Sequence, residues 1–235
     1  MWRGMLLVAL SAGMCLGASC GLDCTVCGAN VIWPIPSTTV ELDLTDCVLT
    51  IAQTADATDA NAEATIIDSW GLPVELEDGQ AVSVNAQALL PTVTDGDYAR
   101  SVPAADQYVV TVNEPSRGVS TTTIDTPTFT ITSHDDGDGA SLSGFTLEWS
   151  DADAALKVRI SLTQSILGDS KTAKVGPIAD AGSHAFDAAD LADFQQGADI
   201  TVKVTKTNTQ DAINGFNDGE LSVTYSVTIS VTPGP

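Results

Sequence analysis

The sequence predicts an all-β protein built from two consecutive antiparallel β-sandwiches, and three observations lead to this fold class. Short runs of alternating apolar and polar residues recur at intervals of roughly 8 to 15 residues with turn-forming residues between them, as in strands with one wet face. No stretch keeps the apolar period of roughly 3.6 residues that marks an amphipathic helix. The acidic residues are 24 Asp and 7 Glu, and Asp favours turns because its side chain hydrogen-bonds nearby backbone groups.

The first element is an export signal over residues 1–19. Arg3 supplies a positive charge, residues 5–16 form an apolar run too short to span a bilayer, and small residues precede Cys20. The sequence Leu-Gly-Ala-Ser-Cys that ends at Cys20 resembles the cleavage box of bacterial lipoproteins. The resemblance implies that Cys20 is acylated and becomes the mature N-terminus, so that lipid holds the protein to a membrane. Cleavage without lipidation, which gives a secreted protein, is the alternative.

Residues 20–39 are expected to form a short tether that contains cysteine. The segment shows no sustained apolar period, and Pro34 and Pro36 favour an extended chain. It would join the anchored cysteine to the first sandwich.

All five cysteines lie before residue 48. Cys15 is removed with the signal, and Cys20 is assigned to the lipid. An oxidising compartment then predicts a disulfide from Cys47 to Cys24 or Cys27, with one thiol left over. If Cys20 is not acylated, four cysteines allow two bridges.

Residues 40–126 are predicted to form an immunoglobulin-like sandwich, because seven short candidate strands fall within about 85 residues. The candidates are residues 40–44, 47–53, 64–68, 72–76, 81–85, 108–113 and 119–124. Asp106-Gln107-Tyr108, followed by Val-Val-Thr-Val, resembles the tyrosine corner of such sandwiches. The resemblance implies that the Tyr108 hydroxyl bonds back to the preceding loop.

Residues 127–232 are predicted to form a second sandwich, because the pattern resets at Thr126-Pro127. The candidate strands are residues 129–132, 145–149, 156–163, 185–186, 200–206 and 221–231. Leu147-Glu-Trp149-Ser resembles the second strand of fibronectin type III domains, and residues 200–204 resemble that family's Tyr-x-Val-x-Val strand, with Ile200 in place of the tyrosine. The resemblance implies a fibronectin type III-like fold with Trp149 in its core, and it implies no ligand.

The formal net charge of −22 limits the partners. A strongly negative field repels phosphate, so nucleic acid and anionic membrane surfaces are not expected to bind. Cations and basic proteins suit this charge better, and a solvated acidic surface accounts for it without any partner.

Calcium is the one ligand for which the sequence offers candidate residues. Asp135, Asp136 and Asp138 surround two glycines, a composition that can fold around a hard cation, although it is not an EF-hand. A second candidate group is expected at the junction of the two sandwiches, where carboxylates of the second would face Asp106 of the first. Its members are Asp106, Asp151, Asp153, Asp211 and Asp218. Solvated turns are the alternative for both groups.

The patterns of enzymes are missing from this sequence. The stretch Gly139-Ala-Ser141-Leu-Ser143-Gly144 misses the Gly-x-Ser-x-Gly elbow by one residue. The sequence has no phosphate-binding or dinucleotide-binding loop, and its only two histidines lie far apart in the chain. The expected function is that of a non-enzymatic cell-envelope lipoprotein, at the outer membrane on its periplasmic or surface face. It would bind protein or glycan or act as a spacer. A calcium-stiffened adhesin-like pair of sandwiches and an accessory domain of a secreted enzyme are the alternatives. No cofactor is expected apart from calcium, and the oligomeric state stays open.

Overall fold

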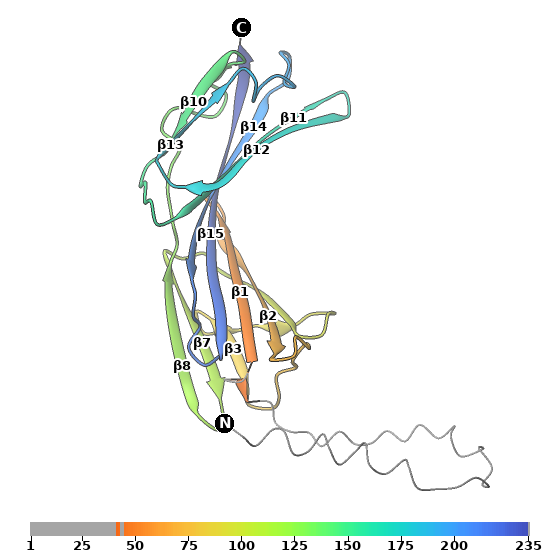
Figure 1. The fold of residues 1–235 in the computed structure, drawn as a ribbon, viewed down its shortest axis with the longest axis vertical. Coiled ribbons are helices and arrows are strands. Elements are labelled where there is room, and N and C mark those ends of the chain that lie inside the picture. The colour runs from red at the N-terminus through yellow and green to blue at the C-terminus, as the bar shows by residue number, and fades with distance from the viewer. Residues whose placement is uncertain (1–40, 43–44, 235) are drawn as a thin grey trace, which may run out of the picture. The chain divides into compact units, whose positions relative to one another are not determined.

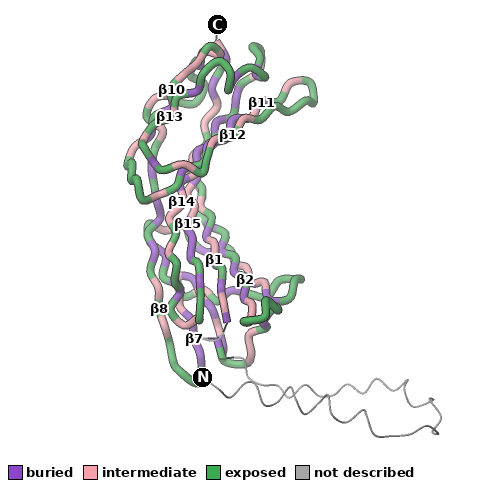
Figure 2. Tube along the Cα trace, in the orientation of Figure 1, coloured by how far each residue is buried: buried purple, intermediate pink, exposed green. Residues whose placement is uncertain are grey.

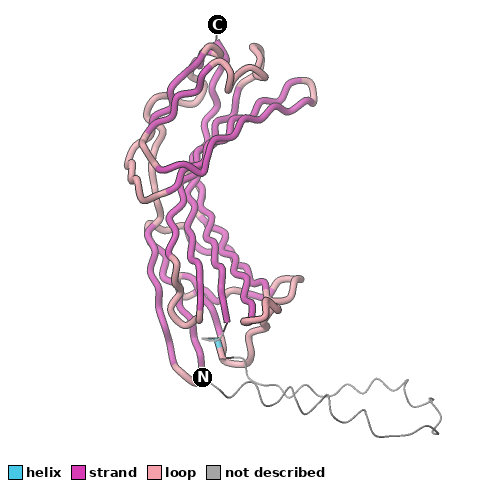
Figure 3. The backbone as a smooth tube through the Cα atoms, in the orientation of Figure 1, coloured by secondary structure: helices cyan, strands magenta, loops and turns pink. Residues whose placement is uncertain are grey.

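The computed structural model describes residues 41–42 and 45–234, and this part of the chain is all-β (Figures 1 and 3). The predicted signal at 1–19, the tether at 20–39 and the cysteines Cys20, Cys24 and Cys27 lie outside the described residues. In the described part, no helix is long and apolar enough to cross a membrane.

The described residues form fifteen strands in three sheets. The strands are β1 (Thr45–Thr54), β2 (Asp59–Asp68), β3 (Ala81–Val84), β4 (Gln87–Ala88), β5 (Leu90–Pro91), β6 (Asp97–Pro103), β7 (Gln107–Glu114), β8 (Gly118–Asp125), β9 (Gly139–Ser141), β10 (Gly144–Glu148), β11 (Lys157–Ile166), β12 (Asp169–Ala179), β13 (Ser183–Asp187), β14 (Ile200–Gln210) and β15 (Asp218–Gly234). The large sheet has the order β12-β11-β14-β15-β1-β2-β6-β5, with β9 paired to the end of β15. The other sheets are β4-β3-β7-β8 and β10-β13.

The first hydrophobic core lies between the β1, β2 and β6 region of the large sheet and the β4-β3-β7-β8 sheet. Alternate residues of each strand point into it, which Figure 2 shows as buried segments along β1 and β2. Its members include Leu49, Ile51, Ile66, Val110 and Ile124. The strict alternation follows from the two-residue period of a strand, which sends successive side chains to opposite faces.

The second core lies between β11, β14 and β15 of the large sheet and the small β10-β13 sheet. Leu162 and Val202 from the large sheet meet Leu147 and Phe186 from the small one. Trp149 is buried in this core, as the sequence predicted.

Strand β15 belongs to both cores. It is 17 residues long, roughly 55 Å at the usual strand rise, which is enough to cross two sandwiches. Leu221 and Val223 at its beginning are buried in the first core, and Val231 near its end is buried in the second. Over Asp218 to Ser226 it pairs in parallel with β1, and over Leu221 to Val231 it pairs antiparallel with β14 (Figure 1). The first core therefore includes residues from well beyond the predicted 40–126 segment.

The tyrosine corner predicted at Tyr108 is confirmed. The Tyr108 ring is buried, and its hydroxyl accepts a hydrogen bond of 3.3 Å from the backbone N–H of Ala105. The same hydroxyl donates to Oε1 of Gln53 at the end of β1, at 2.5 Å. These bonds tie the start of β7 to the large sheet.

A seam of side-chain amides runs along the exposed edge of β8. Asn208 donates to the carbonyl oxygen of Asp125 at 2.9 Å, Gln210 to that of Thr123 at 3.0 Å, and Asn214 to that of Thr121 at 2.6 Å. These carbonyls alternate along the strand and point away from β7, so they would otherwise lack a protein partner. The amide seam therefore joins β8 to the end of β14 and the loop that follows.

Most predicted strands are present, but two are wrong, and the described residues of the predicted strand at 40–44, Glu41 and Leu42, lie in no strand. Residues 72–76 contribute only an isolated bridge from Pro73 to Ile67, and residues 129–132 only a bridge from Ile131 to Trp149. Proline explains the first case, because it lacks the N–H that a continued ladder needs. The sequence also missed β6 and β12, and β12 forms an edge of the large sheet with little buried surface to give it a pattern.

Candidate functional site

The acidic loop at residues 135–138 is held by its own hydrogen bonds. Oδ2 of Asp138 accepts the backbone N–H of Asp135 at 2.8 Å, and Oδ1 of Asp136 accepts the N–H of Ser230 at 2.7 Å. The N–H of Gly137 donates to the carbonyl oxygen of Ser230 at 2.7 Å. Both carboxylates thus accept backbone amides: that of Asp136 attaches the loop to β15, and that of Asp138 closes the loop on itself.

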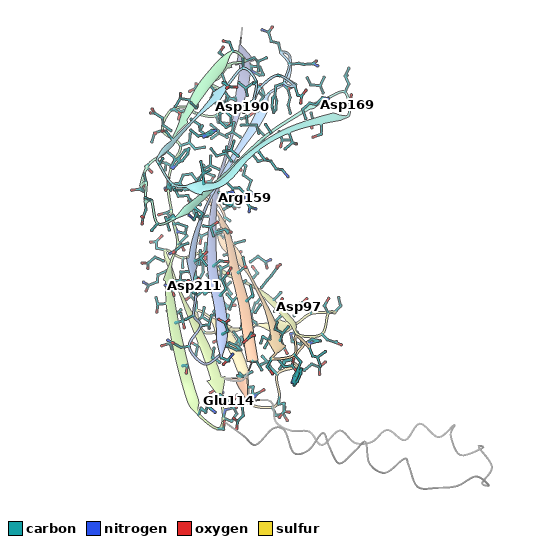
Figure 4. All side chains as sticks on the ribbon, in the orientation of Figure 1. Asp97, Glu114, Arg159, Asp169, Asp190 and Asp211 are labelled. Atoms are coloured by element: carbon teal, nitrogen blue, oxygen red, sulfur yellow. The ribbon has the colours of Figure 1, made fainter. Side chains whose placement is uncertain are left out.

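The structure separates members of the second acidic group. Asp218 pairs with Asp46 at the start of β1. Asp106 lies at the other end of β1, because the backbone N–H of its neighbour Ala105 donates to Gln53 there. Asp46 and Gln53 are seven strand steps apart, roughly 23 Å. This distance is too long for one metal ion to bind Asp218 and Asp106 together. Asp211 lines the same hollow as Asp218. Figure 4 labels Asp211 beyond the end of β14.

Asp151 and Asp153 lie in the second sandwich. Asp151 offers its backbone carbonyl to Lys206, and Asp153 donates its backbone N–H to Asp180. Across the described residues, no group of three His, Cys, Asp or Glu side chains gathers closely enough to hold a metal ion. The calcium hypothesis therefore stays a prediction without a ligand set in this part of the chain.

A buried ionic cluster of Trp149, Asp180 and Lys206 is the most unusual polar feature of the second core. Nζ of Lys206 lies 2.8 Å from Oδ2 of Asp180, and both side chains are fully buried. The ammonium also donates to the carbonyl oxygens of Ser150 at 3.0 Å and Asp151 at 2.7 Å. All three of its N–H donors thus have an acceptor, which is the condition for burying a lysine charge at tolerable cost.

The carboxylate of this cluster is satisfied as fully as the ammonium. Oδ1 of Asp180 accepts the indole N–H of Trp149 at 2.6 Å and the N–H of Gly182 at 3.1 Å, and Oδ2 accepts the N–H of Asp153 at 3.2 Å. Burial opposes ionisation, but the bonds from Lys206, Trp149 and the two amides outweigh it and hold the pKa of Asp180 below its ordinary value. The cluster is therefore a closed structural unit.

The two histidines pack on aromatic rings. His134 lies edge-on to Phe145 with ring centroids 5.5 Å apart, and His184 lies edge-on to Phe186 at 4.8 Å. Nδ1 of His134 is 2.8 Å from the Ser133 hydroxyl. Both imidazoles thus extend the apolar surface of the β10-β13 sheet.

Within the described residues Cys47 makes no disulfide, and its exposed fraction is only 1%. Burial raises its pKa to about 12, which makes the reactive thiolate scarce at neutral pH. Its predicted partners, Cys24 and Cys27, lie outside the described residues. In the described part Cys47 acts as an apolar member of the first core.

The outward face of the large sheet carries basic residues at its β11-β14 end. Lys157 and Arg159 are exposed and alternate with the buried Val158 and Ile160. Register places Ser161 between Lys174 of β12 and Lys203 of β14 in one row across three strands. We call Lys157, Arg159, Lys174 and Lys203 the cationic strip; Figure 4 labels Arg159 on β11.

Two adjoining hollows open on this strip. One, of about 310 Å³, is lined by Arg159, Ile160, Ser161, Lys174, Gly176, Lys203 and Thr205. The other, of about 360 Å³, is lined by Lys157, Val158, Arg159, Pro177, Thr205, Thr207 and Thr224. Gly176 is required here, because its φ is +99° and a Cβ atom would collide with the Val158 carbonyl oxygen. The polar side chains that line both hollows are basic or hydroxylic, with no carboxylate among these described residues.

The other end of the same face is acidic. Asp46 and Val48 of β1 pair with Asp218 and Glu220 of β15, and together with Asp211 they line a hollow of about 370 Å³. Lys203 pairs with Thr228, an even number of residues along β15 from Glu220, so both groups project from one face. The sheet thus has one face with opposite charge at its two ends.

Sequence reasoning missed this separation, because it used the net charge of −22, which sums the whole chain. Lys157 and Arg159 at alternate positions were the available signal, but placing them beside Lys174 and Lys203 requires the strand register. Comparison with protein-family models and with curated proteins gives no match for this chain.

Proposed function

We propose that the chain is a non-enzymatic, lipid-anchored protein of the bacterial cell envelope whose folded unit serves as a spacer and binding module. The observation that supports a spacer is the sharing of β15 between the two cores. Residues 39–235 cluster as one compact unit, so a load or a ligand at one core acts on the other through continuous backbone.

The non-enzymatic part of the proposal is supported by how the polar groups are used. The charges of Asp180 and Lys206 neutralise each other in a dry core, and Asp136 and Asp138 accept backbone amides. The exposed face of the large sheet is instead open and charged, which suits contact with a partner outside the protein.

On the fold, we assign an immunoglobulin-like first sandwich and a fibronectin type III-like second one. The Tyr108 corner supports the first assignment. The buried Trp149 supports the second. Both assignments rest on resemblance of pattern.

The anchor is tested by changing Cys20 and following the protein in a bacterial host. The full chain is expected with the membranes, released by detergent and not by salt, and its intact mass should carry the increment of an acylated cysteine. Cys20→Ser is expected to move the protein to the soluble exported fraction, because the hydrophobic attachment is lost.

Cys15→Ser is the matched control, since it changes a neighbouring cysteine inside the signal. It should leave the protein with the membranes. Membrane attachment that survives Cys20→Ser, or an intact mass without lipid, would refute the anchor. The same mass also counts disulfides, at two hydrogens lost for each.

A further inference from the structure

Basic residues are concentrated on three neighbouring strands. Of the nine Lys and Arg residues in the chain, six lie on β11, β12 and β14. Lys206 is buried in its ion pair, and Lys171 pairs with the buried Gln164, which places it on the other face of the sheet. The remaining four are the cationic strip.

The strip lacks internal counter-charges. None of its four residues takes part in an ion pair within the described residues. Side chains of like charge that share one face repel each other by an amount that an external anion would relieve. An unneutralised basic surface on a protein of net charge −22 is therefore a candidate binding surface.

Screening by salt prevents the acidic end of the face from cancelling the positive potential of the cationic strip. Glu220 and Thr228 on β15 are eight residues apart, roughly 26 Å at the strand rise. The Debye length is about 8 Å at physiological ionic strength. A ligand on the strip thus experiences chiefly the local positive charge, provided that it does not extend over the acidic end.

The lining of the two hollows narrows the ligand chemistry. Arg159, Lys174 and Lys203 supply cationic donors, and Ser161 and Thr207 supply hydroxyls, the groups that bind phosphate, sulfate or carboxylate oxygens. Neither lining includes an aromatic ring on which a neutral sugar could stack. The five residues from Lys157 to Ser161 cover four strand steps, roughly 13 Å, which is longer than a single anion.

We propose that the cationic strip binds an extended anionic glycan, a sugar chain that bears sulfate, phosphate or carboxylate groups. The inference names a partner class for the proposed binding module, and it rests on that proposed function only for its place in the envelope. A narrow chain can lie along β11 and β14 without approaching Asp46 or Glu220. A membrane plane or a duplex nucleic acid is too broad to avoid the acidic remainder of the protein.

The test is a titration of the full chain, purified in a neutral detergent, followed by calorimetry at low and at physiological salt. The probes are a heparin-derived decasaccharide, which carries sulfates and carboxylates, a decagalacturonate, which carries carboxylates only, and the neutral maltodecaose. Binding is expected for one or both anionic probes and not for the neutral one. Affinity should fall as salt rises, because the contacts are ionic.

Variants locate the binding. Arg159→Glu with Lys203→Glu is expected to weaken binding by about tenfold or more, because two charge-assisted contacts become repulsive. Lys171→Glu and Lys174→Glu form a matched pair on β12, on opposite faces. Only Lys174→Glu should weaken binding. Arg159→Gln and Lys203→Gln, which remove the charge without reversing it, replace the charge reversals if those do not fold.

Three results would overturn the proposal: no binding of either anionic probe, equal loss in Lys171→Glu and Lys174→Glu, or binding of maltodecaose as strong as that of the anionic probes. Sedimentation of the native chain adds a fourth. If the native chain is a dimer, and the strip variants dissociate it while the glycans do not, then the strip binds the acidic end of a second copy. Because the titration does not depend on Cys20, its failure is distinct from failure of the anchor.

Discussion

Lys206 shows how a single residue can carry a large share of the stability of the second core. Its ammonium has three acceptors and also lies 4.9 Å from the centre of the Phe129 ring, a cation–π distance. Burying two charges is expensive, and this arrangement offsets the cost only while every partner is in place. The cluster therefore makes the core sensitive to loss of any one member.

We expect Lys206→Met to lower the free energy of unfolding by about 3–5 kcal/mol, because Asp180 would be left buried and unpaired. Denaturant unfolding at pH 7 measures the change. Lys203→Met on the same strand is the matched control, since that side chain is exposed, and its effect should stay within about 0.5 kcal/mol. A small effect of Lys206→Met would show that the core absorbs an unpaired carboxyl.

The same cluster predicts a pH dependence. The pKa of Asp180 is held below its ordinary value of 3.8, so its ionised form is stabilised by folding. Its contribution is fully present above pH 3.8 and is lost as pH falls through the lowered pKa of the folded state. The stability difference between the native chain and Asp180→Asn should therefore be largest near neutral pH and shrink in acid. A difference that grows in acid would contradict this sign.

Among the elements, β8 is an edge strand that side chains of neighbouring segments cover. It forms an edge of its sheet, and exposed edges invite pairing with another chain. The amide seam covers three carbonyls of this edge with side chains in place of a strand. The first sandwich is thereby closed on that side without a continuous backbone ladder.

Replacing Gln210 and Asn214 by Ala should lower the free energy of unfolding by about 1 kcal/mol for each hydrogen bond lost. It should also raise the tendency to associate at high protein concentration, which light scattering detects. Thr209→Ala, at an exposed position between Asn208 and Gln210, is the control and should change neither property. An unchanged double variant would mean that water replaces the amides at no cost.

Elements with a regular pattern could be predicted from the sequence, and edges could not. Strands β11 and β14 bury every second residue over most of their length, and β15 has apolar residues at every second position from Leu221 to Val231, so alternation identified them. Strand β12 has most residues exposed on both faces, and its polar sequence carried no such signal. The parallel pairing of β1 with β15 could not be predicted, because it joins residues 172 apart and depends on register.

In the candidate site, too, residues in a recognisable local pattern were predicted, and groups that depend on strand register were not. Trp149 was placed correctly because the stretch Leu147-Glu-Trp149-Ser resembles a fibronectin type III strand whose tryptophan lies in the core. The predicted gathering of Asp106 with Asp218 failed because β15 runs into the first core and takes Asp218 to the far end of β1. The cationic strip was missed because it is assembled from three strands that only the fold brings together.

For the whole molecule, shared strands predict unfolding as one unit. Leu162→Ala in the second core removes apolar side-chain volume and should cost about 2–5 kcal/mol. Because β15 serves both cores, hydrogen exchange in β1 and β2 of the first core should accelerate together with exchange in β11 and β14. Exchange measured by mass spectrometry, segment by segment, checks this. Acceleration confined to β11 and β14 would show two independent folding units.

The pairing of β1 with β15 also determines the order in which the two cores can be completed during folding. When the chain emerges N-terminus first from its site of synthesis or export, β1 is available long before β15. Thr50 can pair with Ser222 only after 172 further residues have emerged. Until then the first core lacks Leu221 and Val223, and the side of β1 that β15 will cover is an open edge. Long-range strand pairing of this kind is slow and leaves edges exposed to other chains. The molecule can thus complete its first half only after nearly all of its second half has arrived.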